Sequence, residues 1–289
     1  MMNEKSKAMR IHAIKINEVL FHFFIILFGL FMAYPLLWML SSSFKVETEI
    51  FKGLRFLPIK PTFQNYIDGW SSISGFTFGR FLYNTVVISV LQIIGNVVSC
   101  SMAAYAFAKL KFKLNKLLFS IMMLTMMLPF HVKLVPQYII FYKLGWINTI
   151  LPLVVPKFFA VEGFFIFLMV QFMRTLSNEL LEAPRLDGCN TFDIYLRFIL
   201  PLSVPALVTV SIFSFIWSWN DFFSQMLYLS NPGKFTVSIA LRMFLDSTGL
   251  SSWGALFAMS CLTLVPLFAV FVAFQRYLIE GITSGSLKG

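Results

Sequence analysis

Charged residues are scarce in this sequence. Asp, Glu, Lys and Arg make up 12% of its 289 residues, whereas 58% are hydrophobic and 35 are Phe. Soluble domains carry about 25% charged residues. A soluble fold of this length could not remove so much apolar surface from water. The composition therefore excludes an ordinary soluble domain and predicts a chain that crosses a membrane several times.

Residues that form metal sites, disulfide frameworks and catalytic centres are also few. Three cysteines (100, 189 and 261) and three histidines are scattered through the sequence. Their spacing predicts neither a disulfide framework nor a metal site. There is no nucleophile–base arrangement and no Gly-Lys-Ser/Thr phosphate loop. We therefore expect no catalytic residue, metal or cofactor in this chain, and no enzymatic activity of its own.

A soluble basic module for nucleic acid is missing too. The formal net charge is +10, but the basic residues lie in the loops between apolar segments. In membrane proteins such residues set the topology and meet anionic lipid. The charge therefore predicts contact with the lipid bilayer and no nucleic-acid partner.

No signal-peptide cleavage site follows the first apolar segment. A basic stretch precedes this segment, as it would in a signal peptide, but the apolar run is roughly 20 residues long, which is the length of a membrane span. We expect residues 1–18 to be a cytoplasmic tail and the following helix to remain uncleaved.

Six apolar segments have the length of membrane-spanning helices. The predicted fold is all-α, with a transmembrane domain over 19–278 and a cytoplasmic tail over 279–289. Basic residues in the N-terminal tail and at 109–116 place both termini in the cytoplasm. A short interfacial helix is expected over 138–144. The predicted spans are 19–40, 81–107, 117–135, 150–173, 204–227 and 253–278.

One long polar stretch, residues 175–205, interrupts the apolar second half of the chain. Its Glu, Asp and Arg side chains have to face water, which predicts a cytoplasmic helix–turn–helix between spans four and five. Asp187–Gly188 is a turn signal because glycine accepts a positive φ. Pro184 lies in the first helix, either near its start or at a kink.

The second helix of this stretch has its own signals. Asn190 or Thr191 can cap its N-terminus. Apolar residues spaced i, i+3, i+4, i+7 predict one apolar face, and prolines then redirect the chain as it re-enters the membrane. The apolar residues are Phe192, Tyr195, Leu196 and Ile199, and the prolines are Pro201 and Pro205.

This stretch resembles the cytoplasmic signature of permease subunits of binding-protein-dependent ABC importers. The signature reads Glu-Ala-Ala, three residues, Gly, nine residues, Ile-x-Leu-Pro. Pro184 replaces its second Ala and Phe198 its Ile. The residues that match in register are Glu182, Ala183, Gly188, Leu200 and Pro201. Other short stretches, in order, resemble the maltose-type, carbohydrate-uptake class: PTFQNY (61–66), AAYAFAKLKF (103–112), MMLP (126–129) and WND (219–221).

The resemblance implies one permease subunit of an ATP-driven importer for a sugar or oligosaccharide in the bacterial cytoplasmic (inner) membrane. The implied partners are a second permease subunit, two ATP-binding subunits that bind ATP and Mg, an extracellular or periplasmic solute-binding protein, and the carbohydrate substrate. Residues 178–188 would enter a cleft of an ATP-binding subunit, and the 41–80 and 228–252 loops would face the solute-binding protein. The implied coupling residues are Glu182, Ala183, Arg185, Asp187 and Gly188.

Polar residues near the ends of the apolar segments are further candidates. Trp219, Asn220 and Asp221 lie toward the outer end of span five and form either a pathway or gate site or an interfacial belt. In the tail, Gly285 and Lys288 either reach the ATP-binding subunits or belong to a frayed end.

Lys157 and Glu162 are the charged residues of span four. They are five residues apart and would not share a helix face well. Positions at helix ends, or pairing across the bundle, are therefore favoured over a proton relay.

Two other classes stay open from the residues alone. An ion-coupled secondary transporter would need charged residues that converge at mid-membrane, and Lys157, Glu162 and Asp221 are the candidates. A membrane scaffold without transport would tolerate substitutions throughout 175–205.

The predicted orientation can be tested by thiol labelling. In a background without the native cysteines, Lys113→Cys should react with a membrane-impermeant reagent only from the cytoplasmic side, because short basic loops stay inside. Lys60→Cys, in an outer loop, is the matched control and should react in intact cells. Reaction of position 113 in intact cells would contradict the topology.

Overall fold

The computed structural model describes residues 4–52, 55–71, 74–177, 179–186, 188–245 and 252–283. Within these ranges the chain forms helices and connecting turns, with no strand element. The elements are α1 (Glu4–Ser42), α2 (Glu47–Ile50), α3 (Gln64–Ser71), α4 (Phe78–Lys109), α5 (Asn115–Met126), α6 (Phe130–Lys143), α7 (Leu151–Val154), η1 (Val155–Phe159), α8 (Gly163–Thr175), α9 (Glu179–Leu186), α10 (Thr191–Ile194), η2 (Tyr195–Ile199), α11 (Leu200–Leu202), α12 (Val204–Asn220), α13 (Phe223–Tyr228), η3 (Pro232–Lys234), α14 (Val237–Met243) and α15 (Trp253–Thr283).

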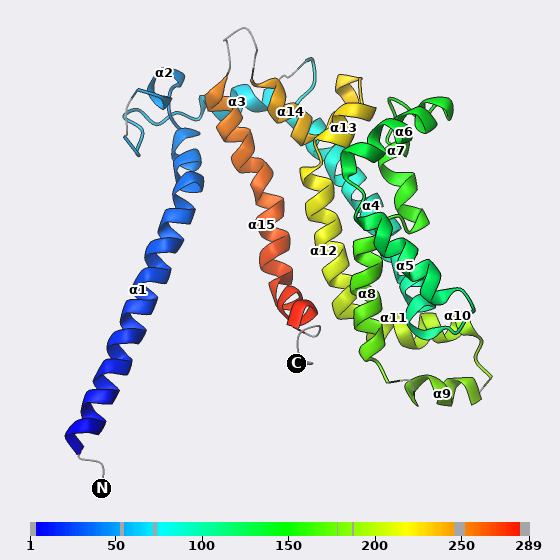
Figure 1. Cartoon of the computed structure of the whole chain (residues 1–289). Helices are drawn as coiled ribbons and strands as arrows, with labels where there is room; N and C mark the ends of the chain where they lie inside the picture. The colour runs from blue at the N-terminus through cyan, green and yellow to red at the C-terminus, as the bar shows by residue number, and fades with distance from the viewer. Residues whose placement is uncertain are drawn as a thin grey trace.

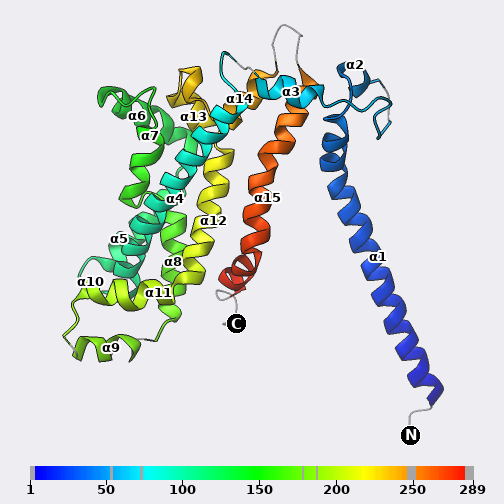
Figure 2. The same ribbon diagram turned by 180° about the vertical axis from the view of Figure 1, so that it is seen from behind.

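The long helices run between two ends of the molecule. α4, α5, α8 and α12 form a bundle, α15 lies beside α12, and α1 stands apart from the bundle (Figure 1). The short helices α2, α3, α6, α13 and α14 gather at one end, and α9 lies at the other. The first turn of α1 and the last turns of α15 point toward the α9 end (Figure 2).

Four described segments are long and apolar enough to cross a membrane: Glu18–Ser42, Phe78–Lys109, Leu151–Thr175 and Trp253–Arg276. Two bent helix pairs pass the same test together, so the described chain has four to six spans. The prediction of an all-helical polytopic membrane protein is confirmed at this level.

Span three is not the single helix predicted over 117–135. α5 ends at Met126, α6 begins at Phe130, and their axes differ by 101°. Pro129 lies between them with an extended ψ of 136°, and proline disfavours helical geometry in the residue before it. The helix expected over 138–144 is the last part of α6.

The fifth apolar segment also differs from its prediction. α12 ends at Asn220, and α13 begins at Phe223 after a turn, so no continuous helix reaches residue 227. At its other end α12 is bent by 77° from the preceding Thr191–Leu202 segment.

α4 is the central helix and packs against α8 and α12. Its Ser89 hydroxyl donates to the Ser218 hydroxyl of α12 at 3.0 Å, and its Asn96 amide donates to Ser214 at 2.8 Å. A Cβ added to Gly95 would lie 3.0 Å from the backbone of Lys157. Small residues and hydrogen bonds at the contact are what allow helices to associate where lipid is as apolar as the side chains.

The 41–80 loop is fastened to the start of α15. The Glu47 carboxylate accepts the backbone N–H groups of Trp253 at 2.8 Å and Gly254 at 2.9 Å. A carboxylate at this position satisfies unpaired N–H groups and complements the helix dipole. The Asn65 amide donates to the carbonyls of Ser43 and Lys45, both at 2.8 Å, and so fixes α3 beside the end of α1.

Removing this cap should destabilise the fold. We expect Glu47→Ala to lower the stability of the purified protein by about 1 kcal/mol, because the first turn of α15 loses a charged acceptor. The shift in thermal unfolding midpoint in detergent measures it. Asp68→Ala is the matched control, since Asp68 is exposed and its carboxylate accepts from the neighbouring Gln64 side chain. Equal shifts for both variants would contradict the assignment.

Candidate functional site

The polar stretch forms the predicted helix–turn–helix at one end of the molecule. The turn after α9 has Gly188 at φ +83°. The Gly188 N–H donates to the Arg185 carbonyl at 3.1 Å, and the Cys189 N–H donates to the Pro184 carbonyl at 3.0 Å. This pair of bonds is the Schellman motif that ends many helices. A Cβ on Gly188 would meet nothing within 4 Å, so backbone conformation, and not space, requires glycine there.

Pro184 lies in the second half of α9, two residues before its end. Of the two interpretations that the sequence left open, a position near the start of the helix is therefore wrong. Because proline has no N–H, the helical bond from residue 184 to the carbonyl of residue 180 is missing. Pro184 is also buried, so its ring packs inward, and its carbonyl accepts the Cys189 N–H in the turn. The substitution in the signature therefore leaves a short helix with an abrupt end.

The α9 knuckle, defined as residues 179–188, has a buried side and an exposed side. Leu181 is buried in a cluster with Met169, Met173 and Ile194. Glu182 and Arg185 are exposed, and Leu186 is 88% exposed. With Glu179, which is also exposed, the described part of the knuckle presents three charges and one large apolar side chain to its surroundings. The side chain of Ala183 and the whole of Asp187, Gly285 and Lys288 lie outside the described residues.

The helix after the turn begins as predicted. The side-chain oxygen of Asn190 accepts the N–H groups of Phe192 and Asp193, both at 2.9 Å. This confirms Asn190 as the cap.

The predicted apolar face of this second helix is only half right. Tyr195 and Ile199 are buried, but Phe192 and Leu196 are exposed. The reason is that Tyr195–Ile199 form a π-helix, whose i→i+5 turn changes which residues align. Ile194 and Ile199, five residues apart, are both buried.

Hydrogen bonds join this region to the nearby end of α4. The Ser101 and Tyr195 hydroxyls are 2.7 Å apart, the Tyr105 hydroxyl donates to the Thr191 carbonyl at 3.2 Å, and Lys109 Nζ donates to the Leu176 carbonyl at 2.6 Å. These bonds join the segments before and after the α9 knuckle to α4.

Trp219, Asn220 and Asp221 do not share one surface. Trp219 is 1% exposed and packs in a cluster that includes Phe78 and Phe81. Asn220 is exposed and its amide donates to the Ile216 carbonyl at 2.8 Å. Asp221 accepts the Ser224 N–H at 3.0 Å. The pathway role of these residues stays a prediction.

The sequence did not single out Trp217 as the accessible tryptophan of α12. Its ring is 44% exposed and stacks on Phe165 with the ring centroids 4.8 Å apart. The signal that could have found it is helical spacing. Trp217 and Trp219 are two residues apart on α12, so they face different directions.

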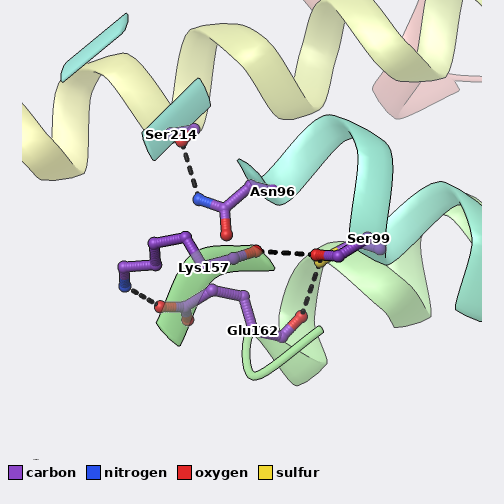
Figure 3. Close-up of polar contacts among 6 residues, drawn as sticks. Asn96, Ser99, Lys157, Glu162 and Ser214 are labelled. Carbon is purple, nitrogen blue, oxygen red and sulfur yellow. Dashed lines mark hydrogen bonds and ion pairs between the residues drawn. The ribbon is translucent and has the colours of Figure 1, made fainter. Parts of the chain in front are cut away.

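Lys157 and Glu162 form an ion pair with each other (Figure 3). The sequence indicated that residues five apart would not share a helix face well, and the two pair because the helix is interrupted between them. η1 ends at Phe159, Ala160 adopts φ +52°, and α8 begins at Gly163. Both residues stand at helix ends, as one interpretation expected.

Within the described residues, the chain is an all-helical membrane protein with interrupted spans and a projecting, capped helical turn. Residues 95–284 match the family described as the binding-protein-dependent transport system inner membrane component. The chain belongs to this family and is a transport component.

Similar proteins of nearly the same length exist. A putative ABC transporter permease protein, ORF2, of Caldicellulosiruptor sp. is 32% identical over 277 residues, covering 96% of this chain and 99% of the relative. The trehalose/maltose transport system permease protein MalG of Thermococcus litoralis is 31% identical and covers 94% and 99%. The crystal structure of a bacterial ABC transporter involved in the import of the acidic polysaccharide alginate shares the fold, with a TM-score of 0.80, 22% identity and coverage of 91% and 96%.

The role of Gly188 can be tested with substitutions that differ in how well they tolerate a positive φ. Gly188→Ala should weaken the Schellman turn by about 1 kcal/mol, because a side chain disfavours positive φ. Gly188→Asn is the matched control and should cost less, since asparagine tolerates this region. Hydrogen exchange of the peptide over 184–190 measures the effect. Equally slow exchange in the wild type and Gly188→Ala would contradict it.

Proposed function

We propose that this chain is one of two membrane-spanning subunits of an ATP-driven importer for a sugar or oligosaccharide, and that it forms half of the translocation pathway. Relatives named for trehalose/maltose, arabinooligosaccharide and diacetylchitobiose transport or uptake support the substrate class. The observation that carries the mechanism is the α9 knuckle, which projects Glu182, Arg185 and Leu186 from the end of the bundle.

The α9 knuckle is the contact with the ATP-binding subunits, which bind ATP and Mg. Its exposed charges and Leu186 suit insertion into a cleft, and the Gly188 turn fixes the angle at which α9 enters. Closure of the two ATP-binding subunits then pulls on the knuckle. The hydrogen bonds from α4 to Leu176, Thr191 and Tyr195 carry this pull into the bundle.

A second permease subunit packs beside this chain. The most apolar stretch of α1 has no buried residue. Its aromatic contact with α15 is made by Trp38 and Phe257, whose ring centroids are 5.3 Å apart. A spanning helix that stands apart from its own bundle leaves room for another subunit and for lipid (Figure 2).

The end opposite α9 docks the solute-binding protein, which places the termini and the α9 knuckle in the cytoplasm. Asn148, at φ +60°, accepts the N–H groups of Ser230 and Asn231 and receives a bond from Lys234. Asn84 donates to the Gly233 and Phe235 carbonyls at 3.0 and 2.8 Å. These bonds hold the loop before α14 in one conformation, as a docking platform requires.

The ion-coupled alternative is not favoured. The family is that of binding-protein-dependent transport components. Lys157 and Glu162 also pair with each other, so neither is an isolated charge for a coupling ion.

Reversing or adding a charge in the α9 knuckle should uncouple transport from the ATP-binding subunits. In the complete complex, Glu182→Lys and Gly188→Asp should reduce recovery of the ATP-binding subunits on co-purification. Uptake of maltose, trehalose or an arabino-oligosaccharide, whichever the wild-type complex transports, should fall at least about tenfold, which corresponds to losing roughly 1.4 kcal/mol at the contact. Asp68→Lys makes the same charge change at the opposite end and should leave recovery of the ATP-binding subunits intact. Normal uptake and assembly in both knuckle variants would refute the coupling role.

A further inference from the structure

Three interruptions of the spanning helices meet at one place in the bundle. They are the break between α5 and α6, the break between η1 and α8, and the turn between α12 and α13. A Cβ on Gly163, the first residue of α8, would lie 2.7 Å from Cγ of Met126 at the end of α5. The rings of His131 in α6 and Phe223 in α13 are 5.5 Å apart.

Irregular backbone at membrane depth is tolerated where protein buries it or where it lines a water-filled space. α4 satisfies part of the break in span four (Figure 3). Ser99 donates to the Lys157 carbonyl at 2.7 Å, and the Cys100 thiol lies 3.9 Å from the Glu162 carbonyl. Beside them, the side-chain oxygen of Asn96 is buried and has no hydrogen-bond partner among the described residues. The break in span four therefore has polar groups on the side that faces α4 and the Lys157–Glu162 ion pair on its other side.

The charged side chains at the break are partly exposed. The side chains of Lys157 and Glu162 are each 23% exposed, and they lie in the interior of the Leu151–Thr175 span. Charged groups at this depth face a bundle interior or a water-filled cavity, because hydrocarbon does not solvate them. This chain alone does not enclose the pair, so it borders a space that the assembled transporter encloses.

Aromatic side chains adjoin the pair on the same element. Phe164 and Phe165 follow Glu162 at the start of α8, and both pack on the exposed ring of Trp217, with centroids 5.4 and 4.8 Å apart. A carbohydrate offers hydroxyl groups that donate and accept, and ring faces of C–H groups that pack on aromatic rings. An ammonium donor, a carboxylate acceptor and an accessible indole together match that chemistry.

We propose that Lys157, Glu162 and Trp217 line the translocation pathway and contact the carbohydrate as it passes. Lys157 donates to solute hydroxyls, Glu162 accepts from them, and Trp217 packs on a sugar ring. The pair carries no net charge, which suits a neutral polyhydroxyl solute better than an ion. This inference rests on the proposed function and adds residues that bind the solute in transit.

Water access is tested first. In the complete complex in proteoliposomes, with the native cysteines replaced by Ser, Val161→Cys next to Glu162 should react with a membrane-impermeant methanethiosulfonate at least about tenfold faster than Val265→Cys in α15. The two valines are similarly exposed in this chain, at 53% and 60%. Equal rates, or no reaction at position 161 with or without ATP, would overturn the proposal.

Solute contact is tested by selectivity. Lys157→Met with Glu162→Gln removes both charges without leaving one unpaired, and the exchange Lys157→Glu with Glu162→Lys keeps the ion pair as a folding control. We expect the neutral double variant to change the ratio of maltose to arabinotriose uptake by about fivefold, or to reduce uptake by that factor if only one of them is transported, while stimulated ATP hydrolysis is retained.

A parallel fall in uptake and ATP hydrolysis in the neutral variant, with the exchange variant normal, would show a structural pair and overturn this inference while the proposed function stands. Unchanged uptake and selectivity in the neutral variant would also overturn it. Failure of the wild-type complex to take up any carbohydrate would instead refute the proposed function, and the substrate assigned here with it.

Discussion

In hydrocarbon, every backbone N–H and C=O group has to find its partner inside the protein, and α4 supplies many of the partners that the interrupted helices lack. Its side chains bond backbone groups at successive levels of the bundle. From one end to the other these are Asn84 with Gly233 and Phe235, Thr85 with Val237, Ser99 with Lys157, Tyr105 with Thr191 and Lys109 with Leu176. The loops, the break in span four and the polar stretch are all positioned by this one helix.

This arrangement gives the proposed transport cycle a physical route. The α9 knuckle is rigid because the Schellman turn and the Asn190 cap satisfy the backbone groups around it. Its motion reaches α4 through hydrogen bonds and the buried Leu181 cluster. Since α4 also holds the backbone of Lys157, movement at the α9 end changes the charged break where the solute is proposed to pass. In the proposed function, this one helix is what couples ATP-driven closure to solute access.

Hydropathy predicted the apolar segments, and local turn chemistry predicted the Gly188 turn and the Asn190 cap, because both depend on neighbouring residues alone. The 101° bend between α5 and α6 was not predicted, since a hydropathy window averages over Pro129. Helical spacing then misled wherever the helix was not an α-helix. The spacing indicated that Lys157 and Glu162 would not share a helix face, although they form an ion pair. It also placed Phe192 and Leu196 on one apolar face with Tyr195 and Ile199, whereas the turn of the π-helix changes which residues align. The depth of Trp219 depends on distant packing partners that no local pattern reveals.

The central claim is that the α9 knuckle touches the ATP-binding subunits. Leu186 is the most direct reporter because it is exposed at the end of α9. With a photo-crosslinking amino acid at position 186, irradiation of the assembled complex should join this chain to an ATP-binding subunit. The same group at Phe63, exposed at the opposite end, should not. An ATP-binding adduct at position 63, or none at position 186 in a transport-competent complex, would contradict the account.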